Sequence, residues 1–406
     1  MVIKPKNIIL PLALLILLWI SWTTYNFVFD MSKPVISIYG LDANGYYSGD
    51  CQCIIRGSDS YKVSDISVWL DNKLIVNKFK INKKEFEHPL PIPTKSLPNG
   101  KHVLKIEAID SSINKNKTLQ EVIFYVDNTP LQAVFVHPDA NYKVFQGRTF
   151  HLQFQVSKSI KEAKIKLLSK TYDCFQESKS SSIYECFVPI DCEESPNEYP
   201  FNVEIIDHTG NTLNLPGKFQ IIPYPFKKHV KLNVDPERVK AQEENSLKQD
   251  LLEEEIEAAF KKSPKQKLWQ GDFYVPMEIS KVSCDFGTKR VTQEKGFYMH
   301  KAVDVVGVPK TVVWAPQDGI IISKNRYTRS GNTVVIDHGL GIFTLLFHLD
   351  KFANINVGDK VKRGNPVGTM GQTGYATGYH LHWEMRIFDG EKGIQIDPLQ
   401  WTTCTF

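Results

Sequence analysis

The chain has 406 residues, of which 42% are hydrophobic, 11% aromatic and 23% charged. This length exceeds what one hydrophobic core usually holds, so we expect several domains, and the composition excludes a disordered or collagen-like chain. The net charge of +4, from 49 basic and 45 acidic residues, is too weak to indicate a nucleic-acid-binding protein.

The N-terminal segment is predicted to be a transmembrane helix. Two lysines precede an apolar stretch from Ile8 to about Phe29, which at roughly 1.5 Å per residue would cover the ~30 Å core of a bilayer. A cleaved signal peptide is the alternative, but no small-x-small cleavage site follows the stretch. We therefore expect residues 1–32 to form a cytoplasmic stub and an uncleaved single-pass anchor in the inner (cytoplasmic) membrane. The bulk of the chain would lie on the periplasmic or extracellular side.

Residues 33–130 and 131–225 are predicted to be two immunoglobulin-like β-sandwich repeats. Alternating apolar segments are separated by turn residues, and the sequence IEAIDSSIN recurs about 97 residues later as VEIIDHTGN. All-strand units of roughly 95 residues have the size of an immunoglobulin-like sandwich, and the shared ending E-x-x-D-x-x-x-N resembles the last hairpin of bacterial Ig-like repeats. We expect a stalk or spacer; binding to a wall polymer or a partner protein is the alternative.

The seven cysteines are compatible with an oxidising compartment but do not establish one. A bridge from Cys174 to Cys186 fits the polar, Ser-rich stretch between them, and Cys192 is an alternative partner. The sequence contains no CxxC motif, so we assign no metal to cysteine.

Residues 226–266 are predicted to be a helical linker. Asp235 followed by Pro236 is a good helix start, because Asp caps the first turn and Pro is tolerated in it. An apolar stripe at helical spacing then runs from Leu247 to Phe260. We expect this stripe to pack on a neighbouring domain. An inhibitory helix lying over an active-site groove is the alternative.

Residues 267–406 are predicted to be a mostly β, antiparallel domain, because period-two runs such as TVVID and GIFTLLFHL alternate with Gly-rich turns. The first segment with chemical potential is HKAVD, which contains His300 and Asp304. A continuous strand would place their Cα atoms about 13 Å apart, at roughly 3.3 Å per residue. A shared metal ion therefore requires a bend in this segment.

The second segment is HLHWEMR, in which His380 and His382 share one face of a strand. One imidazole can bind a metal while the other remains free to act on substrate. Glu384 has the same parity and could orient His382, with a solvated or cross-strand charge as the alternative. His348 closes an apolar strand, and His338 is predicted to belong to a turn.

These segments form an ordered set of motifs that resembles the lysostaphin-like zinc endopeptidases of bacterial peptidoglycan, over roughly residues 268–401. The motifs are SCDFGTKR, HKAVD, APQDG, GNTVVIDHG, FHL, VGDKVKRGNPVG, TGYATGYHLHWEMR and DPLQW. The family usually has glycine where Ala302 stands, and tyrosine is common at the position of Phe347. Neither departure removes a ligand.

The resemblance implies one Zn²⁺ in the catalytic domain, held by His300, Asp304 and His382. Three protein ligands leave a fourth position open for water, as in catalytic zinc sites. His380 and His348 would be the catalytic histidines, one taking a proton and the other stabilising the oxyanion, with the order left open.

The resemblance implies a zinc metalloendopeptidase that hydrolyses peptide bonds in peptidoglycan stems or cross-links, and the N-terminal segment predicts that it is anchored in the membrane. The expected partners are peptidoglycan, the membrane through the N-terminal helix, and divisome or other cell-envelope proteins. A catalytically silent protein that activates or scaffolds another wall hydrolase is one alternative, and an adhesive envelope protein is another. The complete set of ligands and histidines disfavours both. The sequence leaves the bond that is cut undetermined.

Overall fold

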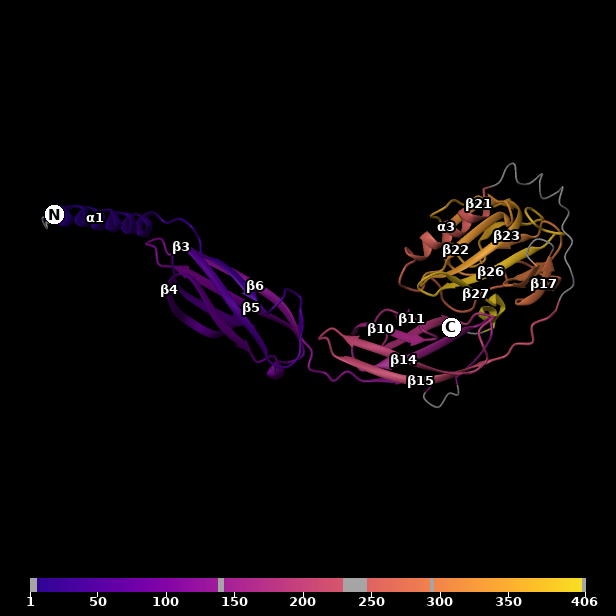
Figure 1. Ribbon diagram of the computed structural model, residues 1–406, viewed down its shortest axis with the longest axis horizontal. Coiled ribbons are helices and arrows are strands. Elements are labelled where there is room, and N and C mark those ends of the chain that lie inside the picture. Colours follow the sequence, from indigo (N-terminus) through magenta and orange to yellow (C-terminus); the bar gives the residue numbers. More distant parts are fainter. Residues whose placement is uncertain (1–5, 138–141, 229–246, 293–295, 404–406) are drawn as a thin grey trace, which may run out of the picture. The chain divides into compact units, whose positions relative to one another are not determined.

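The computed structural model describes residues 6–137, 142–228, 247–292 and 296–403 (Figure 1). The chain divides into two compact units: residues 1–130 with 208–211, and residues 131–207 with 212–406. In the described part of the chain, strands predominate and helices are few. The predicted mainly β class is confirmed. The predicted domain boundaries, at residues 32, 130, 225 and 266, remain predictions.

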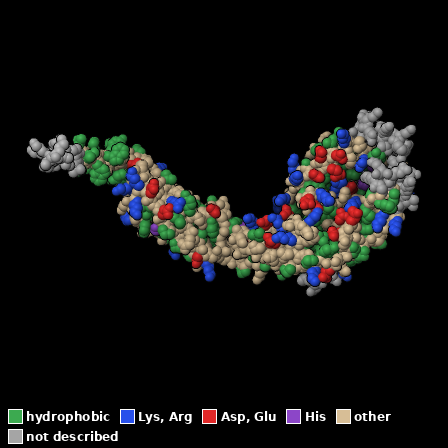
Figure 2. All heavy atoms as spheres, viewed as in Figure 1, with side chains coloured by type: hydrophobic (Ala, Val, Ile, Leu, Met, Phe, Trp, Pro, Cys, Tyr) green, Lys and Arg blue, Asp and Glu red, His purple; other side chains and the backbone are tan. Residues whose placement is uncertain are grey.

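The first helix, α1, spans Lys6–Phe29 and contains 24 residues. Its side chains are described from residue 14 onward, and Figure 2 shows hydrophobic side chains exposed on this stretch. Of the described residues, none belong to a helix long and apolar enough to cross a membrane. The prediction of a transmembrane helix and a single-pass anchor is therefore wrong.

One antiparallel-dominated sheet forms the rest of the first unit, in the order β1-β3-β5-β6-β2, with β4 paired to β3. Alternate residues of the long strands point inward, so that Ile55, Ile66 and Phe124 are completely buried in one core. The elements are β1 (Val35–Tyr39), β2 (Tyr46–Tyr47), β3 (Cys51–Leu70), β4 (Lys73–Ile92), η1 (Thr94–Ser96), β5 (Gly100–Asp110) and β6 (Lys117–Val126).

The second unit begins with two sheets, ordered β11-β10-β14-β15-β8 and β12-β13-β9-β7. Leu152, Phe154 and Val203 belong to the core that both sheets share. The Ig-like assignment of the two repeats stays a prediction. The strands are β7 (Ala133–Phe135), β8 (Lys143–Phe145), β9 (Thr149–Val156), β10 (Ile160–Leu167), β11 (Lys170–Asp173), β12 (Phe175–Gln176), β13 (Ile183–Pro189), β14 (Glu198–Asp207) and β15 (Thr212–Ile222).

Cysteine pairing differs from the expectation of a Cys174–Cys186 bridge. Cys174 and Cys186 are neighbours in the core of the second unit, but both are free thiols. Cys192 is likewise buried and unbridged. Burial raises the pKa of the Cys192 thiol to about 12, so it is neutral at ordinary pH.

The predicted start of the linker helix, at Asp235-Pro236, lies outside the described residues. Its described part is α3, which spans Gln249–Phe260. The buried face of α3 packs on the C-terminal sheet, where the Phe260 ring centroid lies 4.2 Å from that of Phe343 and 5.0 Å from that of Phe388. Of the predicted stripe, Leu252, Ile256 and Phe260 pack on this sheet, whereas Leu247 and Leu251 are exposed.

A ten-stranded antiparallel sheet forms the C-terminal domain, with the main order β16-β19-β26-β23-β22-β21-β24, and β17 pairs with β18 in a separate hairpin. The predicted C-terminal β domain is confirmed. The strands are β16 (Lys281–Cys284), β17 (Thr288–Thr292), β18 (Gly296–His300), β19 (Val303–Val306), β20 (Val312–Trp314), β21 (Gly319–Tyr327), β22 (Gly331–Asp337), β23 (Ile342–Phe352), β24 (Lys360–Val361), β25 (Pro366–Met370), β26 (Leu381–Phe388) and β27 (Gly393–Ile396), before the short helix η2 (Pro398–Thr402).

Candidate metal centre

The HKAVD segment is bent between its two polar ends. β18 ends at His300 and β19 begins at Val303, so Lys301 and Ala302 interrupt the extended backbone. This break brings Nε2 of His300 to 3.1 Å from Oδ1 of Asp304. The bend that a shared ion requires is therefore present.

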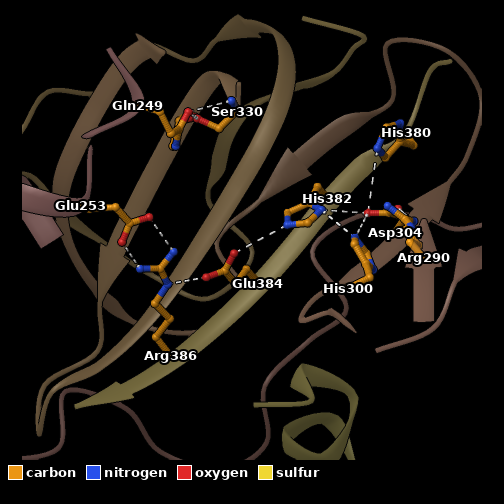
Figure 3. A network of polar contacts seen from close by, with 11 residues as sticks. Gln249, Glu253, Arg290, His300, Asp304, Ser330, His380, His382, Glu384 and Arg386 are labelled. Carbon is orange, nitrogen blue, oxygen red and sulfur yellow. Dashed lines mark hydrogen bonds and ion pairs between the residues drawn. The ribbon is translucent and has the colours of Figure 1, made fainter. Parts of the chain in front are cut away.

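The sheet brings His382 to the same place. Asp304 on β19 lies directly opposite His382 on β26 in the strand pairing. Nδ1 of His382 is 2.9 Å from Oδ1 of Asp304 and 3.1 Å from Nε2 of His300 (Figure 3). On the other face of β26, Leu381 and Trp383 are fully buried. The period-two alternation of β26 thus places the packed side chains on one face of the strand and the candidate metal-site side chain His382 on the other.

These three atoms form a triangle with edges of 2.9 to 3.1 Å. Two imidazole nitrogens and one carboxylate oxygen are the donors that zinc takes in catalytic sites. Tetrahedral ligands about 2.1 Å from zinc lie about 3.4 Å from one another, so a small expansion would admit the ion. The residues present therefore fit Zn²⁺, with a fourth position left for water.

Asp304 is held as a carboxylate. Burial raises the pKa of Asp304, but His300 and His382 hold it well below its usual range. The second oxygen, Oδ2, accepts a hydrogen bond of 2.6 Å from Nη2 of Arg290. Arg290 therefore fixes one oxygen and leaves Oδ1 directed at the two histidines. Arg290 belongs to the SCDFGTKR motif, but its role could not be read from spacing alone.

His382 is positioned by an aromatic ring and a second carboxylate. The ring of Phe347 stacks on it, with centroids 5.0 Å apart and planes 2° from parallel. Nε2 of His382 forms an ion pair of 3.6 Å with Oε2 of Glu384. Burial lowers the pKa of His382, but Asp304 and Glu384 raise it to about 9. Of the two alternatives for Glu384, the structure has the one in which it orients His382.

His380 and His348 lie beside the triangle, with their ring centroids 4.8 Å apart. Nδ1 of His380 is 2.9 Å from the carbonyl oxygen of Gly378, and Nδ1 of His348 is 2.8 Å from that of Thr373. Because a carbonyl only accepts, each Nδ1 must donate, and each Nε2 keeps its lone pair. Burial lowers the pKa of both imidazoles, which are neutral at pH 7. Either can therefore accept a proton.

The backbone at His348 explains how a residue of an apolar strand faces the site. Its φ of 63° lies in the left-handed region, which non-glycine residues seldom adopt. β23 pairs with β26 up to Phe347 and with β25 from Leu349 onward, so His348 lies at the junction. Strained backbone of this kind concentrates at functional sites.

Two further residues near these motifs have different roles. His338 is completely buried, with its ring nitrogens near the carbonyl oxygen of Asp318 and the hydroxyl of Thr344, so it is a structural histidine outside the site. Cys284 is a buried thiol close to the ligand atoms of His300 and Asp304. Spacing did not single out Cys284, although it belongs to the SCDFGTKR motif, because that motif contains no second cysteine.

The comparisons with known proteins bear on this domain. Residues 298–398 match Peptidase family M23. The C-terminal part of this chain is a lysostaphin-like M23 domain. The resemblance stated from the motifs is thereby confirmed, and the matched range contains all five predicted site residues.

Two curated relatives show how far the likeness extends. The peptidoglycan DD-endopeptidase ShyC of Vibrio cholerae is 33% identical over 124 residues, which are 30% of this chain and 28% of ShyC. The DD-carboxypeptidase/endopeptidase Mpg of Neisseria meningitidis serogroup B is 34% identical over 131 residues, which are 32% of this chain and 29% of Mpg. The match thus spans less than a third of each relative and is confined to the length of one domain.

One solved structure is similar over a longer stretch. It is an M23 peptidase from Pseudomonas aeruginosa, 21% identical, covering 64% of this chain and 95% of its own, with a TM-score of 0.42. A score of this size does not establish a shared arrangement of domains.

Proposed function

We propose that this chain is a zinc endopeptidase that hydrolyses peptide bonds in peptidoglycan, with His300, Asp304 and His382 holding the metal. The observation that carries the proposal is the triangle of three ligand atoms with two neutral histidines beside it. The M23 domain and relatives named as peptidoglycan DD-endopeptidases support it. Their names favour cross-links between D-amino acids over glycine bridges as the substrate.

When bound, zinc would polarise the scissile carbonyl and lower the pKa of a water molecule toward neutrality. Nε2 of His380 or of His348 can accept a proton as the general base, because both Nδ1 atoms are committed to carbonyl oxygens. To stabilise the developing oxyanion, the other histidine must carry a proton on Nε2 as well, that is, be an imidazolium. Asp304 stays ionised throughout, held by Arg290 at Oδ2.

The place of action follows from the substrate. Peptidoglycan lies outside the cytoplasmic membrane, so we propose that the catalytic domain works on the periplasmic or extracellular side. Divisome or other cell-envelope proteins would be partners there. The upstream sheets would act as a spacer between those partners and the peptidase.

The test uses the full chain with purified peptidoglycan as substrate. We expect one zinc per chain and soluble muropeptides whose masses identify the cut bond. His382→Ala should lose zinc, whereas His380→Ala should keep zinc and lose cleavage. Full zinc loading with no release of muropeptides from any wall preparation would reject the peptidase and favour a silent activator of another hydrolase.

A further inference from the structure

The linker helix α3 is joined to the C-terminal sheet by a paired charge. Glu253 on α3 contacts Arg386 on β26 with both oxygens: Oε2 is 2.5 Å from Nη1, and Oε1 is 3.1 Å from Nη2 (Figure 3). Such a two-pronged pair fixes orientation as well as distance. Arg386 is almost fully buried, with 7% of its side chain exposed, whereas 48% of Glu253 is exposed.

The pair continues toward the metal centre. Nε of Arg386 donates to Oε1 of Glu384, and Oε2 of Glu384 pairs with Nε2 of His382 at 3.6 Å. Glu384 and Arg386 are both almost fully buried. The two ring nitrogens of His382 thus lie between Asp304 on one side and Glu384 on the other. A chain of four alternating charges runs from α3 to a metal-site histidine (Figure 3).

A second connection starts one turn earlier on α3. The side-chain oxygen of Gln249 accepts from the backbone nitrogen of Ser330 at 3.1 Å and from its hydroxyl at 3.3 Å. The carbonyl oxygen of Ser330 in turn accepts from the backbone nitrogen of His348 at 2.8 Å. His348 has the strained φ of 63°, which the surrounding structure must hold.

We propose that α3 is a positioning element of the metal centre: Glu253 fixes the orientation of His382 through Arg386 and Glu384, and Gln249 fixes the backbone of His348 through Ser330. The assignment of roles to the two histidines rests on the proposed function. Glu253 and Gln249 touch neither metal nor substrate in this scheme; they act through the residues between.

The physical reason is the need to pair buried charge. Without Glu253, the Nη donors of Arg386 lose their carboxylate. The buried guanidinium of Arg386 then interacts more strongly with Glu384, the carboxylate that remains. The ion pair between Glu384 and Nε2 of His382 is then weaker, and the orientation of the His382 ring is less well fixed. Partners that orient metal-binding histidines typically change metal affinity by 10- to 100-fold when removed. The apolar face of α3, with Leu252 and Ile256 buried, keeps the helix in place during such a change.

The experiment compares Glu253→Gln and Glu253→Ala with Glu254→Gln, an exposed neighbour on the same helix, in the full chain. Zinc affinity is measured by chelator competition, and the imidazole ¹⁵N resonances of His382 are recorded without metal. We expect about a tenfold loss of affinity for Glu253→Ala, a smaller loss for Glu253→Gln and altered His382 resonances. Glu254→Gln should match the wild type.

Gln249→Ala provides the second arm. It should leave zinc affinity unchanged and lower kcat at saturating zinc, with KM unaffected, because His348 is outside the proposed ligand set. Wild-type zinc affinity and unshifted His382 resonances in Glu253→Ala would overturn the role of Glu253, and unchanged kcat in Gln249→Ala would overturn that of Gln249. The zinc and NMR measurements need no peptidase activity, so they remain decisive for Glu253 even if the proposed function fails.

Discussion

Asp304 and His382 face each other across β19 and β26, with Oδ1 of Asp304 2.9 Å from Nδ1 of His382. Strand pairing therefore sets this distance, and no loop has to close to bring the two side chains together. His300 joins them from a separate hairpin, at the end of β18. Two proposed ligands on paired strands and one beside a bend make a site whose geometry is largely set by the fold.

Asp304→Asn tests the charge of this centre. The amide keeps the size of the side chain but removes the negative charge that attracts the metal, and it leaves the buried Arg290 without its carboxylate. We expect zinc affinity to fall by at least 100-fold, measured by chelator competition, with a lower melting temperature. Glu257→Gln, on the exposed side of α3, is the control. Zinc binding as tight as in the wild type would show that Asp304 is no ligand.

Much of this centre could be predicted from the sequence, because strand parity places His380 and His382 on one face and motif order adds His300, Asp304 and His348. The bend in HKAVD could also be inferred, since an extended chain cannot bring its ends together. The position of His348 could not, because it depends on a left-handed backbone at a junction between two partner strands.

Contacts between distant segments could not be predicted from the sequence. Arg290 and Asp304 are joined only through the fold, as are Glu253 and Arg386, which are 133 positions apart. No periodicity encodes which charge on a helix will meet which charge on a sheet. The prediction for the N-terminal segment was wrong for a different reason. Its apolar composition predicted a membrane span, but none of the described residues belong to a helix long and apolar enough to cross a membrane.

His380→Ala and His348→Ala should separate catalysis from metal binding. Neither imidazole is in the ligand triangle, so zinc content should stay at one per chain. Loss of a general base or of oxyanion stabilisation typically costs 10²- to 10⁴-fold in kcat. We expect reductions of that size for both variants in muropeptide release. The pH profile should lose its acidic limb only in the variant that lacks the base, and loss of zinc from either variant would place that histidine among the ligands.

Phe260→Ala tests the docking of α3. The Phe260 ring is buried between Phe343 and Phe388, at centroid distances of 4.2 and 5.0 Å. Truncating a buried Phe to Ala costs about 3–5 kcal/mol, because transfer energy is lost and a cavity remains. Urea unfolding should show a loss of that size, and partial proteolysis should cut earlier near α3. Leu251→Ala, at an exposed position of the same helix, should cost less than about 1 kcal/mol.

Asp337 gives the C-terminal domain a pH-dependent stability that is independent of the metal. The side chain is buried, and Oδ1 accepts hydrogen bonds from the backbone nitrogen of Gly339 at 2.7 Å and from the hydroxyl of Ser263 at 2.8 Å. Burial raises the pKa of Asp337 from 3.8 to about 6. The folded state therefore binds a proton more tightly than the unfolded state.

Because the folded pKa is the higher one, stability from this group is fully present below about pH 4 and is lost as pH rises through about 6. A shift of about two pKa units corresponds to roughly 2–3 kcal/mol. Asp337→Asn stays neutral and keeps the oxygen that accepts both hydrogen bonds. The variant should gain stability over the wild type from pH 4 to pH 7, by up to about 2 kcal/mol in urea unfolding. A difference between the two proteins that stays constant across this range would contradict a raised pKa at Asp337.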